Sequence, residues 1–497
     1  MTRPSIFSSF VLLGLLLAGV SFAADDSPHR PRVGLVLGGG GARGAAHVGV
    51  LETLERLHVP VDCVAGTSMG ALAAGAFAAG RSPAEMRQAL AKADWNDMFQ
   101  DNPGYTEINY RNKEIAKRFM PGSETGVGSA GVAYQGGVVA GQKIKLFFNR
   151  LVNADLGERN IESLPLPLSI IATDIGTGER VVYRDGSLTM AMRASMSVPG
   201  LLAPVNYRGR KLVDGGLVDN LPIAEVRERC QADVVIAVNV GSPLMKAEEV
   251  GSLFTVSAQM INILTEQNVS HSLALLRSAD IYIKPDLEGI GAGDFQNSSD
   301  TADRGRVAAE AVSARLQALA VSAEAYAAWA KRVAYVRQSP PSVDAVVIDG
   351  LKAVNPVAVE RYLSLKPGDP IDDARVNQDM LRIYGDGWYE SVELFAGQRA
   401  RPQHPARDAG GEKLGLRLSA LRREPAEQLQ AGFHLHVARG LRQDLAQFAR
   451  RRVAGRRRDR PRESDWRRSV PAARCASALF RGEQPVLWKR DDRPLPG

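Results

Sequence analysis

Apolar and polar residues follow one another in blocks that predict alternating strands and helices in the first part of the chain. Val33–Leu37 is a continuous apolar run, which is typical of a strand buried on both faces. A glycine-rich segment, residues 38–44, comes next, and the spacing predicts an amphipathic helix from Ala45 to about Leu57. Val59–Ala65 is predicted as a second short strand and Ala71–Ala79 as a second helix. This β-α-β-α order predicts an α/β fold with a mostly parallel sheet and helices on both faces.

The same pattern continues to about residue 335. Further strands are predicted at Leu168–Thr173, Arg180–Tyr183, Val234–Val238 and Ile281–Lys284. Helical patterns at about 253–278 and 302–333 complete this first domain, which we assign to residues 32–335. Residues 95–142 are glycine-rich and irregular, and they are expected to form a lid or access loop.

A second, smaller unit is predicted over residues 342–425, after the boundary at Ser339-Pro340-Pro341. A strand, a helix capped by Asn355, a second helix and two paired strands follow in that order. Their predicted ranges are Val343–Gly350, 355–365, a helix ending at Ile383, Glu390–Phe395 and Leu414–Ser419. The unit is therefore expected to be a compact β-α-α-β-β domain.

Residues 438–497 account for the chain's net positive charge. This segment has 17 Lys and Arg against 7 Asp and Glu, and subtracting its +10 from the whole-chain +7 leaves −3 for residues 1–437. The segment has neither helical nor strand periodicity, so it is predicted to be a disordered tail or out-of-frame translation. Because the main body is mildly acidic, no nucleic-acid partner is expected.

The N-terminus resembles a secretory signal. Arg3 precedes the short apolar run Phe10–Val20, and Ser21-Phe22-Ala23 supplies small residues at a cleavage position. Because the run is shorter than the ~20 residues of a spanning helix, a signal peptide over residues 1–23 is favoured over a membrane anchor. The three cysteines are odd in number and far apart, so no disulfide framework is expected, and Cys63 and Cys230 are predicted to be small core residues.

The chemistry of the chain is predicted to centre on Ser68. Gly66 and Gly70 flank it in a G-x-S-x-G pattern between a strand and a helix, where a sharp turn would expose its hydroxyl near a helix N-terminus. Such patterns also occur by chance in tight turns. Ser68 is therefore a candidate nucleophile that needs support from a base and an oxyanion site.

The glycine-rich loop is the candidate oxyanion site. Successive N–H groups of Gly39, Gly40 and Gly41 at a helix start suit a developing anion, and Ala42, Arg43 and Gly44 complete the loop. Arg43 is expected to anchor either the loop or the anion. Gly39-x-Gly41-x-x-Gly44 also satisfies a dinucleotide-binding pattern. That reading is disfavoured because Asp62 precedes the second strand's core, where the pattern requires an acidic residue at the strand's end.

The candidate base is an aspartate, since no histidine is placed to reach Ser68. The chain has seven histidines, and His47 and His58 flank the first helix, where surface or packing roles are expected. The others are His29, His271, His404, His434 and His436. Asp214 follows a predicted strand, and Gly215 and Gly216 leave space around it, which suits a Ser–Asp dyad. The alternative is an ordinary Asp-Gly turn.

These three elements in this order resemble the patatin-like phospholipase family. The matching motifs are the G-G-G-x-[KR]-G loop at 39–44, the elbow at 66–70 and D-G-[AG] at 214–216. The motifs cover about residues 32–240, with Arg193–Pro199 and 213–222 as further matching segments. The resemblance implies a three-layer sandwich, Ser68 as nucleophile, Asp214 as base and a phospholipid or other acyl ester at a membrane surface as substrate, without metal or cofactor. It implies loop-stabilising roles for Asp219 and Asn220.

The second unit resembles a POTRA domain through Gly350-Leu-Lys and Tyr384–Val392. A signal peptide, patatin domain and POTRA domain in series resemble bacterial fused phospholipases that continue into an outer-membrane β-barrel. Residues 431–436 match an opening barrel strand, but no further alternating segments of about ten residues follow. The resemblance implies export to the periplasm, outer membrane or medium of a Gram-negative-type bacterium, with outer-membrane assembly machinery as a partner. The alternative function is a non-enzymatic envelope assembly factor that works through the POTRA-like unit.

Overall fold

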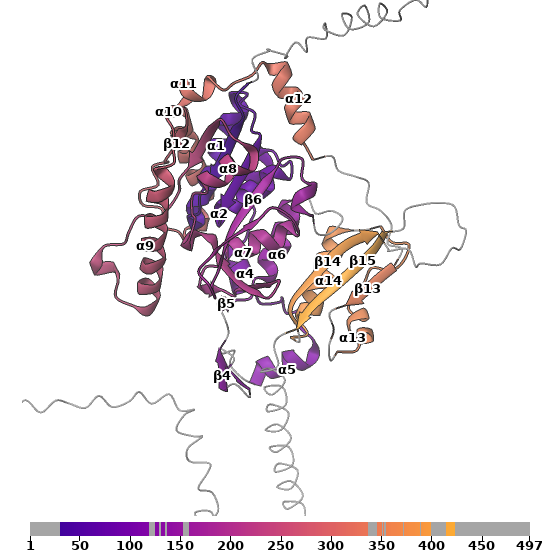
Figure 1. Ribbon diagram of the computed structural model, residues 1–497. Helices are drawn as coiled ribbons and strands as arrows, with labels where there is room; N and C mark the ends of the chain where they lie inside the picture. Colours follow the sequence, from indigo (N-terminus) through magenta and orange to yellow (C-terminus); the bar gives the residue numbers. More distant parts are fainter. Residues whose placement is uncertain are drawn as a thin grey trace, which may run out of the picture. The chain divides into compact units, whose positions relative to one another are not determined.

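The computed structural model describes most of the chain between residues 30 and 422 (Figure 1). The described ranges are 30–118, 125–128, 131–134, 137–152, 159–335, 345–349, 351, 354–370, 372–387, 389–398 and 414–422. The predicted signal peptide, the barrel-like strand at 431–436 and the basic tail lie outside these residues. Within the described residues, no helix is long and apolar enough to cross a bilayer.

An eight-stranded mixed sheet forms the centre of the larger domain, in the order β12-β11-β1-β2-β6-β10-β9, with β7 paired to β6. Its strands are β1 (Val33–Leu37), β2 (Cys63–Thr67), β6 (Leu168–Asp174), β7 (Arg180–Tyr183), β9 (Val205–Tyr207), β10 (Arg210–Asp214), β11 (Val234–Val238) and β12 (Ile281–Ile283). The pairings from β12 through β6 are parallel, as predicted. The strands β7 and β10 run antiparallel to β6, so one side of the sheet departs from the parallel pattern.

Helices cover both faces of this sheet, which gives the expected three layers (Figure 1). Leu35 and Leu37 of β1 face one core cluster, and Val36 between them faces the other, as the period of two in a strand requires. The first cluster packs against α1 (Ala46–Arg56), α2 (Met69–Ala78), α6 (Gln142–Leu151), α7 (Leu188–Ser195) and α10 (Ser298–Ala311). The second packs against α8 (Ile223–Cys230) and α9 (Leu253–Leu273). Every residue of β1 is buried, as its unbroken apolar run predicts.

Two segments differ from their predictions. Residues 95–142 contain regular elements instead of one irregular lid: α4 (Trp95–Gln100), α5 (Tyr110–Arg118), β3 (Thr125–Gly128), β4 (Gly131–Tyr134) and β5 (Gly137–Val139). Asp94 caps α4, and Trp95 is buried against Phe147 and Phe295. The helical pattern at 302–333 is divided into α10, α11 (Ser313–Gln317) and α12 (Ala323–Val333), the last capped by Ser322. A short helix, α3 (Pro83–Ala91), follows α2.

The smaller unit has the predicted β-α-α-β-β order. Its elements are β13 (Ala345–Asp349), α13 (Pro356–Glu360), α14 (Asp373–Tyr384), β14 (Tyr389–Gln398) and β15 (Leu414–Arg422). The strands lie in the order β13-β15-β14, with β13 parallel to β15. Asn355 caps α13 as predicted, because its side chain accepts the Val357 N–H. Val359, Met380 and Ile383 are buried in this unit.

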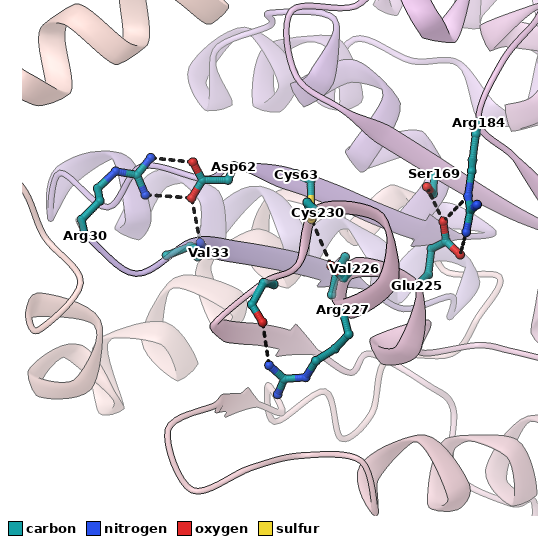
Figure 2. The surroundings of a disulfide bond; sticks show 11 residues. Arg30, Val33, Asp62, Cys63, Ser169, Arg184, Glu225, Val226, Arg227 and Cys230 are labelled. Carbon is teal, nitrogen blue, oxygen red and sulfur yellow. Dashed lines mark hydrogen bonds and ion pairs between the residues drawn. A yellow bond between two sulfur atoms is a disulfide. The ribbon is translucent and has the colours of Figure 1, made fainter. Parts of the chain in front are cut away.

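A disulfide joins Cys63 to Cys230, contrary to the prediction of two independent core cysteines. Figure 2 shows the bridge between the start of β2 and the end of α8. The two Cα atoms are 6.2 Å apart, although 167 positions separate the residues in sequence. Packing of α8 against β2 creates this proximity, so no local cysteine spacing could have indicated it.

We expect the Cys63→Ala/Cys230→Ala double variant to unfold more easily than the parent, because a disulfide across so long a segment restricts the unfolded chain. The free energy of unfolding should fall by about 2–4 kcal/mol, measured by urea titration. Cys475→Ala, which leaves this pair intact, is the control. Titration of the denatured, unreduced parent with a thiol reagent should find one free thiol, and three would contradict the bridge.

Candidate active site

Ser68 lies on a strained turn between β2 and α2. Its φ is 54° and ψ is −125°, a conformation that a side chain other than glycine's rarely adopts. A Cβ on Gly66 would run into the Gly70 backbone, and one on Gly70 would run into the carbonyl of Leu37. The flanking glycines therefore permit the close packing that this turn needs. The Ser68 N–H donates to Ser195 Oγ at 2.8 Å, and Ser195 Oγ donates to the Ile171 carbonyl at 2.5 Å.

The structure brings Ser68 and Asp214 into direct contact. Ser68 Oγ donates a hydrogen bond to Asp214 Oδ2 at 2.6 Å, although 146 positions separate the two residues. Asp214 ends β10, and its other oxygen, Oδ1, accepts the Gly216 N–H at 2.8 Å. Only 7% of Ser68 and 6% of Asp214 are exposed. Burial raises the pKa of Asp214 to about 6, against the lowering effect of these two hydrogen bonds.

The glycine-rich loop lies against Ser68. A Cβ on Gly39 would come within 2.8 Å of the Ser68 Cβ, so only glycine permits this approach. The Gly39 N–H donates to Asn220 Oδ1 at 3.1 Å, and the Ala42 N–H donates to the Ala292 carbonyl at 2.8 Å. In the part of the chain that the structure describes, the N–H groups of Gly40 and Gly41 make no hydrogen bond. Gly39, one of the three predicted oxyanion donors, is thus already engaged.

Arg43 anchors the loop through hydrogen bonds to backbone carbonyls. Its buried guanidinium donates to four carbonyls, those of Val240, Gly241, Leu287 and Ile290, at 2.8–3.2 Å. Burial lowers its pKa. The structure therefore favours the first of the two roles expected for this side chain, and it fixes the start of the short 3-10 helix at Gly41–Ala45.

The chain is similar in sequence to a known family and to several curated proteins. Residues 35–227 match the model of the patatin-like phospholipase family. This part of the chain is similar to the patatin-like phospholipase family. An NTE family protein of Mycobacterium tuberculosis is 33% identical over 210 residues, which are 42% of this chain and 49% of that protein. Human patatin-like phospholipase domain-containing protein 6 is 35% identical over 213 residues, 42% of this chain and 13% of that protein. The chain thus spans about half or less of the curated relatives it matches.

Among solved structures, VipD from Legionella pneumophila superposes with a TM-score of 0.27 and 15% identity, covering 59% of this chain and 67% of that one.

Histidines do not enter the Ser68–Asp214 pair, and His47 has the second of its two expected roles, packing inside the domain. His47, expected at the surface or in packing, is fully buried, and its Nε2 bonds the Gly38 carbonyl at 2.7 Å. Burial lowers its pKa to about 4. His58 stacks on Tyr326. His29, His404, His434 and His436 lie outside the described residues.

Several contacts around the Ser68–Asp214 pair carry no local sequence signal. Ser195 lies in a segment interpreted only as structural support, yet its hydroxyl fixes the Ser68 backbone. Asn268 of α9 donates to the Gly216 carbonyl at 2.8 Å, and no motif marks it. Asp219 pairs with Arg180 at 2.7 Å, while its carbonyl accepts the Thr67 hydroxyl. Within the described residues, no group of three or more His, Cys, Asp or Glu side chains could hold a metal ion.

We expect Gly70→Ala to destabilise the larger domain, because the new methyl group must displace the Leu37 carbonyl at the end of β1. Overpacking of this kind costs about 1–3 kcal/mol, so the melting temperature should fall clearly. Gly293→Ala is the matched control, since nothing lies within 4 Å of its added Cβ. Differential scanning calorimetry of both variants tests this expectation, and equal melting temperatures would contradict the steric account of the elbow.

Proposed function

We propose that the chain is a serine lipid acyl hydrolase, a phospholipase A-type esterase that works through a Ser68–Asp214 dyad. The observation that carries this proposal is the 2.6 Å hydrogen bond from the Ser68 hydroxyl to the buried Asp214 carboxylate. Ser68 is also held in a strained backbone conformation. The patatin-like family match supports a lipid ester as the substrate. A nicotinamide or nucleotide role for the glycine loop is disfavoured, because this loop packs directly on Ser68.

In the acylation step, Ser68 Oγ attacks the ester carbonyl carbon and its proton passes to Asp214 Oδ2. The carbonyl oxygen becomes an oxyanion, which the free N–H groups of Gly40 and Gly41 stabilise. The tetrahedral intermediate then collapses, the alcohol leaves with the proton from Asp214, and the acyl group stays on Ser68. In deacylation, water attacks the acyl-Ser68 ester and gives a proton to Asp214. Collapse of the second intermediate returns that proton to Ser68 Oγ and releases the fatty acid.

We further propose that the protein is exported and that residues 342–425 form a POTRA-like domain that contacts outer-membrane assembly machinery. The Cys63–Cys230 disulfide supports export, because such bonds persist in oxidising compartments. The β-α-α-β-β order of the smaller unit supports the POTRA-like assignment. The assembly-factor alternative predicts that Ser68→Ala leaves the protein's cellular phenotype unchanged.

We expect Ser68→Ala and Asp214→Asn each to lower phospholipid hydrolysis by at least about 10³-fold, because members of a nucleophile–base pair act as one unit. Both variants should also lose labelling by a fluorophosphonate probe. Ser169→Ala is the control, since Ser169 is a buried serine that bonds Glu225 and lies outside the dyad. Wild-type turnover by either folded dyad variant would refute the mechanism.

The rate of ester hydrolysis should depend on pH through Asp214. As a base it must be ionised, so kcat/KM should fall about tenfold per pH unit below an apparent pKa of about 6 and level off above it. Asp219, whose pKa is also raised to about 6 by burial, is the internal control. The Asp219→Asn variant should keep the same inflection. If that variant lost the inflection, the titrating group would be Asp219 and not Asp214.

A further inference from the structure

The peptide group that joins Gly38 to Gly39 is held at both of its polar ends. His47 Nε2 bonds the Gly38 carbonyl at 2.7 Å, and the Gly39 N–H donates to Asn220 Oδ1 at 3.1 Å. The carbonyl and the N–H of a trans peptide point in opposite directions, so two such bonds fix the orientation of the whole plane. The Gly38 N–H is itself fixed by the Val238 carbonyl of β11.

The next peptide plane is held by the same asparagine. Asn220 Nδ2 donates to the Gly39 carbonyl at 3.2 Å, so the N–H of Gly40, at the other end of this plane, points away from Asn220. Asn220 thus bonds both the N–H and the carbonyl of Gly39 through one side-chain amide. Asn220 is 2% exposed, and its side chain lies beside Gly216, two residues after Asp214.

We propose that Asn220 and His47 are positioning residues for the hydrolysis. They orient the N–H of Gly40 toward the oxyanion by fixing its own peptide plane and the plane before it, and they thereby place the adjoining peptide that carries the N–H of Gly41. This inference rests on the proposed function of Ser68. It gives Asn220 a specific role in place of general loop support, and it gives His47 a role in a reaction that uses no histidine as a base.

A run of glycines needs such external restraint. Glycine backbone is the most permissive of all, so an unrestrained loop would sample many orientations of its N–H groups. Oxyanion donors are effective only when they are oriented before the charge develops. Asn220 and His47 supply hydrogen bonds from outside the loop, which the glycines themselves cannot provide.

Both restraining side chains are themselves well fixed. The Asn220 N–H donates to Asn268 Oδ1 at 2.9 Å, and Asn268 Nδ2 bonds the Gly216 carbonyl, so α9 links the glycine loop to the Asp214 turn. His47 is buried on α1, and the lowered pKa keeps its ring neutral at physiological pH. The Gly38 carbonyl can only accept a hydrogen bond, so the single ring proton is on Nε2, and Nδ1 has no partner among the described residues.

The decisive variant is Asn220→Asp in the full chain, assayed with a vesicle of phosphatidylcholine and with a soluble short-chain ester. A carboxylate still accepts the Gly39 N–H, but it cannot donate to the Gly39 carbonyl and repels it. We expect kcat to fall about tenfold to a hundredfold on both substrates, less than the 10²–10³-fold loss for deleting an oxyanion donor, while KM changes less than about threefold. The rate of fluorophosphonate labelling should fall in parallel.

His47 provides an independent test with a rescue. His47→Phe places another aromatic ring at this position but removes the donor to the Gly38 carbonyl, so kcat should fall about tenfold. His47→Gln restores a side-chain donor and should recover much of the loss. Thr53→Val is the matched control on the same helix, because Thr53 is buried and bonds only the Gly49 carbonyl of α1. It should keep the parent kcat even if its melting temperature falls.

A wild-type kcat in folded Asn220→Asp, or equal kcat values for His47→Phe and His47→Gln, would overturn the inference. If Asn220→Asp fails to fold, the two His47 variants decide alone. A failure of the proposed function is recognised by a different result: Ser68→Ala would then hydrolyse the same esters at the parent rate. Loss of stability without a fall in kcat would assign both residues a purely structural role.

Discussion

The hydrogen bond between Ser68 and Asp214 depends on the register of one strand, β6. Ser68 directly follows β2, whose Thr67 pairs with Ile171 of β6, and Asp214 ends β10, where it pairs with Ala172 of β6. Two adjacent positions of β6 thus align the end of its parallel neighbour β2 with the end of its antiparallel neighbour β10. A shift of either pairing by one residue would turn one of these side chains to the opposite face of the sheet. The antiparallel side of the sheet is therefore a requirement of the site.

Burial sets the chemical character of the pair. An aspartate in water has a pKa near 3.9 and is a weak base, whereas the buried Asp214 has a pKa raised to about 6. Such a shift corresponds to about 3 kcal/mol that disfavours the ionised carboxylate. This is a net value, because the hydrogen bonds from Ser68 and from the Gly216 N–H already offset part of the cost of burial, and they hold the carboxylate in place. A carboxylate of this kind suits proton transfer from a serine without a histidine between them.

Short sequence patterns predicted those strands and motif residues whose structure depends mainly on their neighbours in the chain. The strands β1, β7 and β11 have the predicted bounds, and the motif glycines at 66, 70 and 215 lie where an added Cβ would meet backbone. The contacts that complete the site join residues far apart in sequence, as between Gly39 and Asn220, and a single sequence carries no signal for them. The same reason explains the missed disulfide and the hydrogen bond between His47 and Gly38, which was not predicted. The glycine-rich composition of residues 95–142 gave no signal for α4, which the Asp94 cap and the packing of Trp95 on Phe295 stabilise despite weak helix propensity.

The most direct test of the account is to capture the acyl-enzyme. Rapid acid quenching of the protein during phospholipid turnover, followed by peptide mass spectrometry, reports which side chain carries the acyl group. The account predicts a single acyl ester on Ser68 that accumulates before steady state and disappears as the substrate is consumed. Steady turnover with the acyl group on another residue, or with hydrolysis that persists when Ser68 is alanine, would contradict it.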